Sequence, residues 1–141
     1  MIKDNLSFIA SKRGEKALRI HESAENYLET IHILKERLGQ VRSIDIASEL
    51  SYSKPSVSVA MKNLRNNGYI EVDPDGYITL LDKGREIAEK MYERHTLLSD
   101  LLTSLGVNPQ TAAEDACRIE HVISEETFLA FKAHAAKYKK Q

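Results

Sequence analysis

The sequence predicts a mainly α-helical protein with one small β-hairpin, in which a winged helix-turn-helix precedes an α-helical domain. Two observations lead to this expectation. Apolar residues recur with the helical period along several long segments, and "DPDG" at 73–76 separates two short β-prone runs. The 141 residues are 42% hydrophobic, which is enough for a buried core. We divide the chain into an N-terminal arm (1–21), a winged unit (22–82) and a helical domain (83–141).

The N-terminal segment is rich in Lys and Arg and poor in apolar residues. This composition predicts that residues 1–21 form a solvated arm, and it leaves open that the arm touches DNA phosphates. A helix is expected next, with Ser23 as its N-terminal cap and Gly39 at its end. Its apolar positions have the spacing of one core-facing stripe: Tyr27, Leu28, Ile31, Leu34 and Leu38.

Two shorter helices joined by a tight turn are predicted to follow. Ser43 can cap the first helix, and "SYS" at 51–53 interrupts its pattern. Ser53 can cap the second helix, with Pro55 in its first turn, where proline is tolerated. "NNG" at 66–68 ends this helix before the hairpin. Two helices about a tight turn, followed by a hairpin, make up a winged helix-turn-helix.

The rest of the chain predicts three further helices. Asp82 can cap a long helix that ends at Gly106, Asn108 can cap the next one, with Pro109 at its first position, and Ser124 can cap the last. Apolar positions in "HTLLSDLLTSLGV" exceed what one buried helix face needs, which indicates contact with a second copy of the chain. We therefore expect a homodimer.

The second helix of a helix-turn-helix lies in the major groove of DNA, where its first residues meet the base edges. Here the exposed face of that helix carries Ser, Lys, Arg and Asn without any Asp or Glu, in a chain of net charge −1. This face favours binding to double-stranded DNA, and a scaffold or protein-binding module is the alternative. The expected DNA-binding residues are Arg42, Ser53, Lys54, Pro55, Ser56, Ser58, Lys62 and Arg65.

Candidate metal ligands occur in three segments. In "DACRIEH", a helix would put Cys117, Glu120 and His121 on one face, because positions i, i+3 and i+4 are neighbours. The first long helix and the long helix of the second half add further donors. Thiolate, imidazole and carboxylate donors together suit a divalent first-row transition metal. The candidate ligands are Asn26, Glu29, His95, Cys117, Glu120 and His121.

Residues 22–138 resemble the diphtheria toxin repressor family, which includes the manganese transport regulators. The resemblance rests on "AENYLETIHIL", "DIASELSYSKPSVSVAMKNLRNNGYI", "ITLLDKG", "ERHTLL" and above all "DACRIEHVIS". Members of this family are dimeric, metal-dependent transcriptional repressors with a winged helix-turn-helix. The resemblance implies that Fe(II) or Mn(II) binds this chain and favours its DNA-binding form.

The resemblance also divides the candidate ligands between two sites. The main regulatory site would consist of Asn26, Cys117, Glu120 and His121, and the second site of the manganese branch of Glu29, His95 and Glu120. The family usually has Met or Asp at the position of Asn26. The chain ends where manganese regulators end, whereas Cys117 points to iron, because thiolate favours Fe(II) over Mn(II).

The function expected from these observations is that of a metal-dependent DNA-binding repressor that senses Fe(II) or Mn(II) and controls metal-homeostasis genes. A winged-helix regulator that senses oxidant through Cys117, or another ligand without metal, is the alternative. An enzyme is not expected, because the sequence has no catalytic metal motif such as "HExxH". A single cysteine fits the reducing cytoplasm, and no apolar run is long enough for a membrane span.

Overall fold

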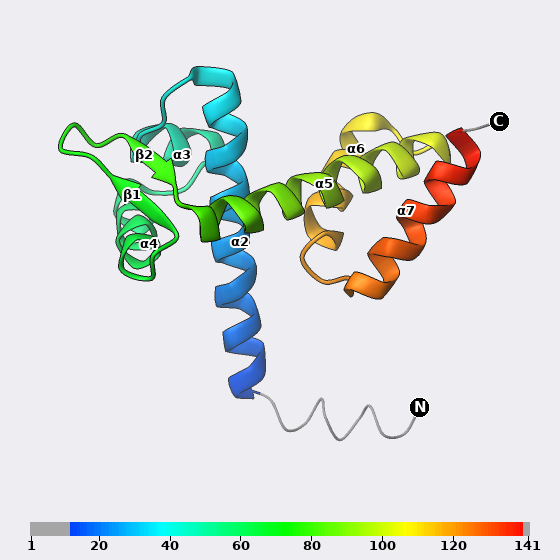
Figure 1. Ribbon diagram of the computed structural model, residues 1–141, viewed down its shortest axis with the longest axis horizontal. Helices are drawn as coiled ribbons and strands as arrows, with labels where there is room; N and C mark the ends of the chain where they lie inside the picture. Colours follow the sequence, from blue (N-terminus) through cyan, green and yellow to red (C-terminus); the bar gives the residue numbers. More distant parts are fainter. Residues whose placement is uncertain (1–11, 140–141) are drawn as a thin grey trace.

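The computed structural model describes residues 12–139, with side chains over residues 21–138. The expectations for residues 1–11 lie outside this range. Within it, the chain forms six helices and one two-stranded sheet, which confirms the predicted mainly α-helical fold with a β-hairpin. The winged unit lies at one end of the molecule and the helical domain at the other, and α5 (Asp82–Ser104) runs between them (Figure 1).

The helix α2 (Lys12–Leu38) runs past the junction of the two ends. Its predicted apolar stripe is buried from Tyr27 to Leu34, whereas Leu38 is exposed. Gly39 ends the helix as predicted, with φ +82° and its N–H donating to the Lys35 carbonyl at 2.9 Å.

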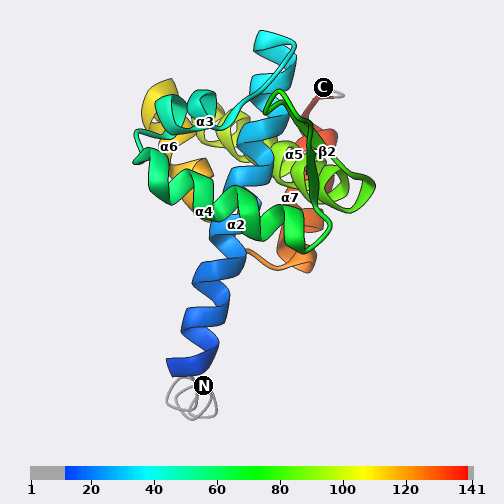
Figure 2. The same ribbon diagram turned by 90° about the vertical axis from the view of Figure 1, so that its left-hand side faces the viewer.

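The start of α2 differs from the prediction. The helix begins at Lys12, so Ser23 is not its cap and residues 12–21 of the predicted arm are helical. These first turns project beyond the rest of the chain (Figures 1 and 2). Once packing has fixed the later turns, extending a helix adds one hydrogen bond for each residue ordered, so no buried stripe is needed for the extension.

The helix-turn-helix consists of α3 (Ser43–Leu50) and α4 (Lys54–Asn66). The cap of α3 is Arg42 rather than Ser43, and the Asp45 carboxylate accepts the Arg42 N–H at 2.9 Å. Ser53 caps α4 as predicted, because its hydroxyl oxygen accepts the N–H of Ser56 at 3.3 Å. The predicted order of elements is thus confirmed.

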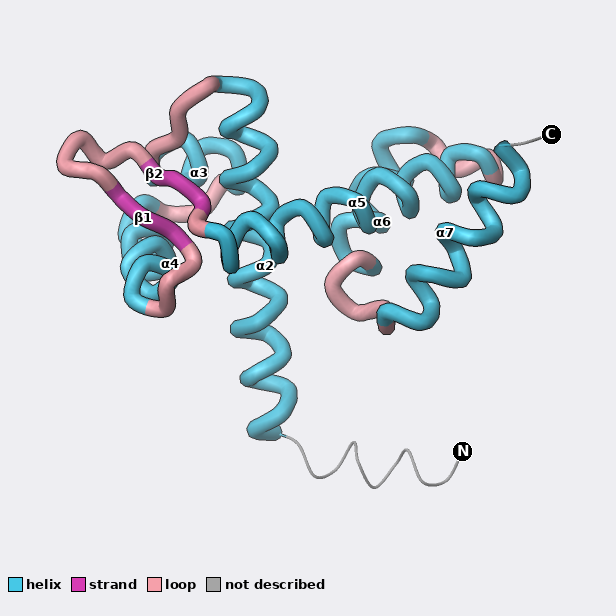
Figure 3. The backbone as a smooth tube through the Cα atoms, in the orientation of Figure 1, coloured by secondary structure: helices cyan, strands magenta, loops and turns pink. Residues whose placement is uncertain are grey.

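The wing is the antiparallel pair β1 (Ile70–Val72) and β2 (Ile78–Leu80), which lies next to α4 (Figure 3). The predicted turn joins the two strands. The Asp73 carboxylate accepts the N–H groups of Asp75 and Tyr77, both at 2.9 Å, and Gly76 has φ +87°. A left-handed residue is required in this turn, and glycine adopts that conformation without strain.

The helix α5 starts against the wing. Its cap is Leu81, and the predicted cap Asp82 is its first residue. Gly84 permits the close approach, because a Cβ at this position would clash with the backbone carbonyl of Tyr69. That carbonyl accepts the Leu81 N–H at 3.0 Å, so it cannot move without losing a hydrogen bond.

The last two helices, α6 (Pro109–Ile119) and α7 (Glu125–Lys139), pack on α5. Asn108 and Ser124 form the predicted caps. The helix α6 ends at Ile119, so Glu120 and His121 lie in a turn that the prediction had included in the helix. No helix in the described part of the chain is long and apolar enough to cross a membrane.

Candidate metal centre and DNA-binding surface

The six predicted metal ligands meet at the junction of the two units. They come from three segments that are far apart in the sequence: α2, α5, and the end of α6 with the turn after it. Five of them form two overlapping clusters of ligand atoms, and the sixth lines a cleft beside the first cluster.

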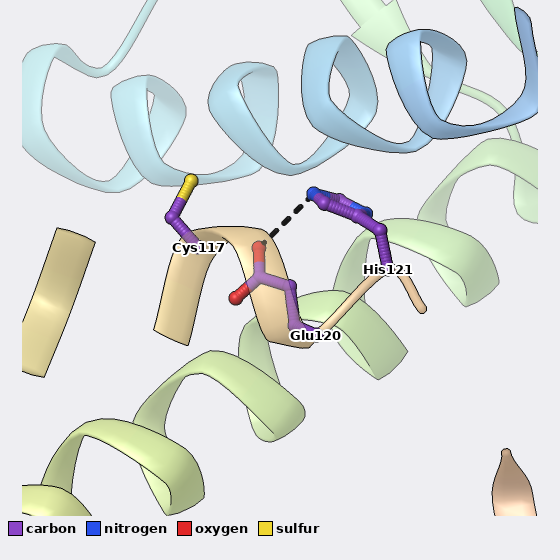
Figure 4. A group of neighbouring side chains, drawn as sticks. All are labelled: Cys117, Glu120 and His121. Carbon is purple, nitrogen blue, oxygen red and sulfur yellow. Dashed lines mark ion pairs between the residues drawn. The ribbon is translucent and has the colours of Figure 1, made fainter. Parts of the chain in front are cut away.

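The first cluster consists of Cys117, Glu120 and His121. Their ligand atoms lie within 4.8 Å of one another, and His121 Nε2 is 3.3 Å from Glu120 Oε1. Cys117 and His121 point toward α2, with the Glu120 carboxylate between them (Figure 4). Although α6 ends at Ile119, Glu120 keeps helical backbone angles, φ −57° and ψ −28°. The three side chains therefore share one side, as their spacing predicted.

The second cluster consists of Glu29, His95 and Glu120, whose ligand atoms also lie within 4.8 Å of one another. His95 Nδ1 is 2.9 Å from Glu120 Oε2. Glu120 belongs to both clusters and has one carboxylate oxygen near each histidine. Through Glu29 and His95, the fully buried Glu120 side chain brings the turn after α6 next to α2 and α5.

A cleft of about 410 Å³ opens beside the first cluster. Asn26 lines it together with Cys117 and His121, so the structure places this predicted ligand on the side of the first cluster. Tyr52, from the turn between α3 and α4, also lines the cleft. Asparagine offers a neutral carbonyl oxygen, which is an acceptable ligand for a hard cation.

Burial shifts the pKa values of the two buried glutamates of the clusters upward, toward their protonated forms. Burial raises the pKa of Glu29 to about 8, and the neighbouring Glu120 adds to the shift. Burial also raises the pKa of Glu120 to about 7. Two carboxylates in one buried site repel each other unless a proton or a cation compensates the charge. A bound divalent cation would supply that compensation.

Glu25 holds the ring of His121, a role that sequence reasoning did not find. Its Oε1 lies 3.3 Å from His121 Nδ1 and 3.5 Å from Nδ1 of the exposed His21. Burial opposes the charged form of His121, but contacts with Cys117, Glu25 and Glu120 outweigh it and raise the pKa of His121 to about 10. Since Glu25 engages Nδ1, the other ring nitrogen faces the first cluster.

Three buried polar atoms of the clusters make no hydrogen bond among the described residues: Glu29 Oε2, Glu120 Oε1 and His121 Nε2. The last two face each other at 3.3 Å as an ion pair and have no other partner in this part of the chain. Buried polar groups are nearly always hydrogen-bonded, so such atoms need an explanation. All three belong to predicted ligands and are atoms that a metal ion binds. The residues present therefore fit a divalent cation.

Arg94 fixes the turn that carries Glu120 and His121. This buried guanidinium donates from Nη1 to the carbonyl oxygens of Glu120 at 3.1 Å and Ile123 at 2.9 Å, and from Nη2 to Glu125 at 2.9 Å. Two carbonyls of the segment after α6 are thus satisfied by a side chain of α5. This tertiary contact holds Glu120 and His121 in place at the end of the helix.

The predicted DNA-binding residues lie on the winged unit, where α4 runs across the face turned to the viewer in Figure 2. Every one of these side chains is exposed: Arg42, Ser53, Lys54, Pro55, Ser56, Ser58, Lys62 and Arg65. The Arg42 guanidinium lies 4.3 Å from the ring centroid of Tyr77, so it stacks on the wing. The structure thus connects the start of α3 with the wing on this surface.

Val59 adds an apolar side chain to this surface, and sequence reasoning missed it. It lies on α4 between the predicted contact residues Ser58 and Lys62 and is 61% exposed. An exposed β-branched side chain on a recognition helix can contact the methyl group of thymine. The other large aliphatic side chains of the helix, Val57, Met61 and Leu64, form its buried stripe.

Two family descriptions match the chain. Residues 19–78 match the iron dependent repressor, N-terminal DNA binding domain, and residues 81–140 match the iron dependent repressor, metal binding and dimerisation domain. The two matches meet at the start of α5, where the wing ends.

Relatives with curated names support the same family. The chain is 36% identical over 117 residues to the transcriptional regulator MntR of Escherichia coli, and this covers 83% of the chain and 76% of the relative. It is 33% identical over 106 residues to the diphtheria toxin repressor of Corynebacterium glutamicum, covering 74% of the chain and 46% of that protein.

Solved structures agree with these matches. A manganese-dependent transcriptional repressor in complex with manganese superposes with a TM-score of 0.72 at 27% identity, over 79% of this chain and 51% of that one. The manganese regulator SloR superposes with a TM-score of 0.70 at 27% identity, over 80% of this chain and 53% of that one. The chain thus spans about half the length of these solved structures. Its two domain matches, its identity to MntR and these superpositions together show that it belongs to the iron-dependent repressor family.

Proposed function

We propose that this protein is a homodimeric repressor of transcription that binds its DNA operator when a divalent metal occupies the junction of its two units. The observation that carries the proposal is the position of Glu120. This buried carboxylate belongs to both ligand clusters, and the clusters join α2, α5 and the end of α6. A metal bound there would hold the DNA-binding unit and the helical domain in one arrangement.

We assign the proposed ligands to two metal ions. Asn26, Cys117, Glu120 and His121 would hold the ion of the first cluster, and Glu29, His95 and Glu120 would hold a second ion. Bound metal supplies positive charge that stabilises the ionised carboxylates. Because metal requires deprotonated ligands, its binding replaces the protons that the buried glutamates otherwise retain. The binding free energy then stabilises the arrangement in which the three segments meet.

The donor set favours Fe(II) over Mn(II) in the first cluster. The thiolate of Cys117 is a soft ligand, and affinity for nitrogen, oxygen and sulfur donors rises from Mn(II) to Fe(II). The second cluster offers two carboxylates and one imidazole, which accept either ion. We therefore propose that both Fe(II) and Mn(II) activate the protein and that Fe(II) binds more tightly.

The DNA-binding mode follows from the winged unit. The first residues of α4 would meet base edges in the major groove, while Lys62 and Arg65 would contact phosphates. A two-fold dimer places two such helices about one turn of DNA apart, so their spacing must be fixed for both half-sites to be read. Metal at the junction would fix that spacing.

The second copy would cover the exposed apolar end of α5. Leu105 at this end is 73% exposed, and a groove of about 520 Å³ beside it is lined by residues of α5 and α7 that include Leu97, Leu101 and Tyr138. Leu97 and Leu101 are half-buried, while Leu105 and Tyr138 are exposed, and an accessible apolar patch of this kind is typical of an interface. The position lies within the matched dimerisation domain.

The proposal is tested by measuring DNA affinity with and without metal. A duplex is first selected from a random library with protein in Mn(II), and its binding is then titrated anaerobically without metal, with Mn(II) and with Fe(II). We expect either metal to raise the affinity by about 5- to 150-fold, the usual range of allosteric coupling. Equal affinity in all three conditions would contradict the proposal.

Substitutions of the proposed metal ligands test whether these clusters are the site at which metal raises DNA affinity. Glu120→Gln removes the carboxylate shared by both clusters and is expected to abolish the response to both metals. Glu126→Gln, an exposed glutamate at the start of α7, is the matched control and is expected to respond as the wild type does. A wild-type response in Glu120→Gln would rule out these clusters as the regulatory site.

A further inference from the structure

The metal cleft has a wall from the DNA-binding motif itself. Tyr52 lies in the turn between α3 and α4, and it lines the same cleft as Asn26, Cys117 and His121. The other helix-turn-helix residues of the described chain do not line this cleft. A side chain of the turn that leads into the recognition helix thus lines the same cleft as three proposed metal ligands.

The ring of Tyr52 rests on the helix that carries two of the predicted ligands. It packs edge-on against the ring of Tyr27, with centroids 6.0 Å apart and planes at 75°. Tyr27 is buried and directly follows Asn26 on α2. An edge-to-face pair of this kind has a preferred geometry, so movement of α2 against the turn has an energetic cost.

The backbone on both sides of Tyr52 is tightly held. Ser51 before it closes α3 in the left-handed conformation, with φ +56° and ψ +39°. The N–H of Tyr52 donates to the Ala47 carbonyl at 3.1 Å. Ser53 after it caps α4. With both neighbours fixed, the backbone of Tyr52 is directly joined to the first turn of α4 and has little freedom to move independently of it.

We infer that Tyr52 couples occupancy of the metal cleft to the position of the recognition helix α4. The inference rests on the proposed function and adds the residue through which the metal site acts on the DNA-binding motif. Asn26 of α2, Cys117 and His121 would close on a bound metal ion, and the Tyr27–Tyr52 contact would transmit the movement of α2 to the start of α4. Tyr52 is a positioning residue in this scheme and need not contact metal or DNA.

The test measures the coupling between metal and DNA, not either affinity alone. Mn(II) affinity is measured without DNA, and affinity for the selected duplex is measured with and without Mn(II), in the wild type, Tyr52→Ala and Tyr52→Phe. In Tyr52→Ala we expect the Mn(II)-induced gain in DNA affinity to fall by about tenfold. Metal affinity without DNA should stay within about twofold of wild type, and Tyr52→Phe, which retains the ring, should keep the coupling.

Tyr92→Ala is the matched control. Tyr92 is 45% exposed, Tyr52 is 46% exposed, and Tyr92 also packs edge-on against a ring on α2, that of His32. It does not line the metal cleft. Its removal is expected to leave the coupling at the wild-type value. Thermal unfolding of each variant establishes that it is folded, and Tyr52→Leu serves if Tyr52→Ala is not.

The outcomes separate this inference from the proposed function. If Mn(II) does not change the DNA affinity of the wild type, both the proposed function and the role of Tyr52 are overturned. A metal-dependent wild type with unchanged coupling in Tyr52→Ala overturns the role of Tyr52 alone. A loss of DNA affinity that is equal with and without Mn(II) also overturns it, because the coupling is then intact and Tyr52 acts by contacting DNA or by supporting the turn.

Discussion

At the scale of single residues, Glu25 engages Nδ1 of His121 and leaves Nε2 facing the first ligand cluster. A histidine ligand usually donates its other ring N–H to a carboxylate, which fixes the tautomer and ring orientation. Glu25→Gln keeps the size of this side chain but removes its charge. We expect metal affinity to fall about 10- to 100-fold, measured by anaerobic competition against a chelator with Co(II) as the probe.

The control for Glu25 is Glu36→Gln, an exposed glutamate on the same helix. It removes the same charge from α2 without touching His121, so its metal affinity should match wild type. Nitrogen NMR of His121 adds a readout that a general loss of stability would not produce: the wild type should carry its proton on Nδ1 in the metal-bound form. A mixture of tautomers in metal-bound wild type would contradict the role of Glu25.

Single-residue patterns in the sequence predicted part of this site. Cys117, Glu120 and His121 were found because one turn of helix sets their proximity, and the structure brings them together. Glu25 was not found, because its partner His121 is 96 residues away and only tertiary packing makes the contact. A carboxylate beside a predicted ligand was the one available signal, and glutamate next to asparagine on a charged helix is too common to be specific.

At the scale of elements, Arg94 joins α5 to the turn between α6 and α7. Arg94→Met retains an apolar stem but leaves two backbone carbonyls without a donor. We expect the free energy of unfolding to fall by about 2–6 kcal/mol, from two carbonyls left unpaired at about 1–3 kcal/mol each. Metal affinity should fall as well, because the turn carries Glu120 and His121. Chemical denaturation and metal titration measure the two effects.

Lys90→Met is the matched control for Arg94. Lys90 contacts the same carboxylate oxygen of Glu125, at 3.4 Å, but it is exposed and makes no contact with the turn. Exposed ion pairs contribute less than about 1 kcal/mol, so the control should be nearly as stable as wild type. Equal effects of the two substitutions would show that the charge near Glu125 matters and the support of the turn does not.

Elements were predicted best where a local signal marks them. The caps at Ser53, Asn108 and Ser124 and the hairpin turn at 73–76 were predicted because short side-chain to backbone contacts form them. The starts of α3 and α5 were wrong by one residue, and two other helix ends were wrong by more. The helix α6 ends at Ile119, where Arg94 binds the segment that follows, and α2 extends to Lys12 although no apolar stripe marks those turns.

At the scale of the whole molecule, α2 and α5 bring the proposed ligands together where the winged unit and the helical domain meet. Each helix contacts the winged unit and also carries at least one proposed ligand. The helix α2 packs in the core of the winged unit and carries Asn26 and Glu29. The helix α5 starts at the wing and carries His95. The sequence predicted both units and a metal site between them, but not the route by which they communicate, because that depends on which side chains meet across the cleft.

In the proposed mechanism, the dimer sets the spacing of the two DNA-binding units, so disrupting its interface should weaken DNA binding without removing the metal site. Leu101→Asp with Leu105→Asp places charges in the proposed interface, where they cannot be buried without a partner. We expect the double variant to be a monomer by light scattering at concentrations where wild type is a dimer. Its metal affinity should persist, since every proposed ligand comes from one chain. Its affinity for the selected duplex should fall about 10²-fold or more, because each half-site is then bound independently.

Leu38→Asp, on an exposed leucine at the end of α2, controls for added charge and should remain dimeric. A double variant that stays dimeric would place the interface elsewhere on the helical domain.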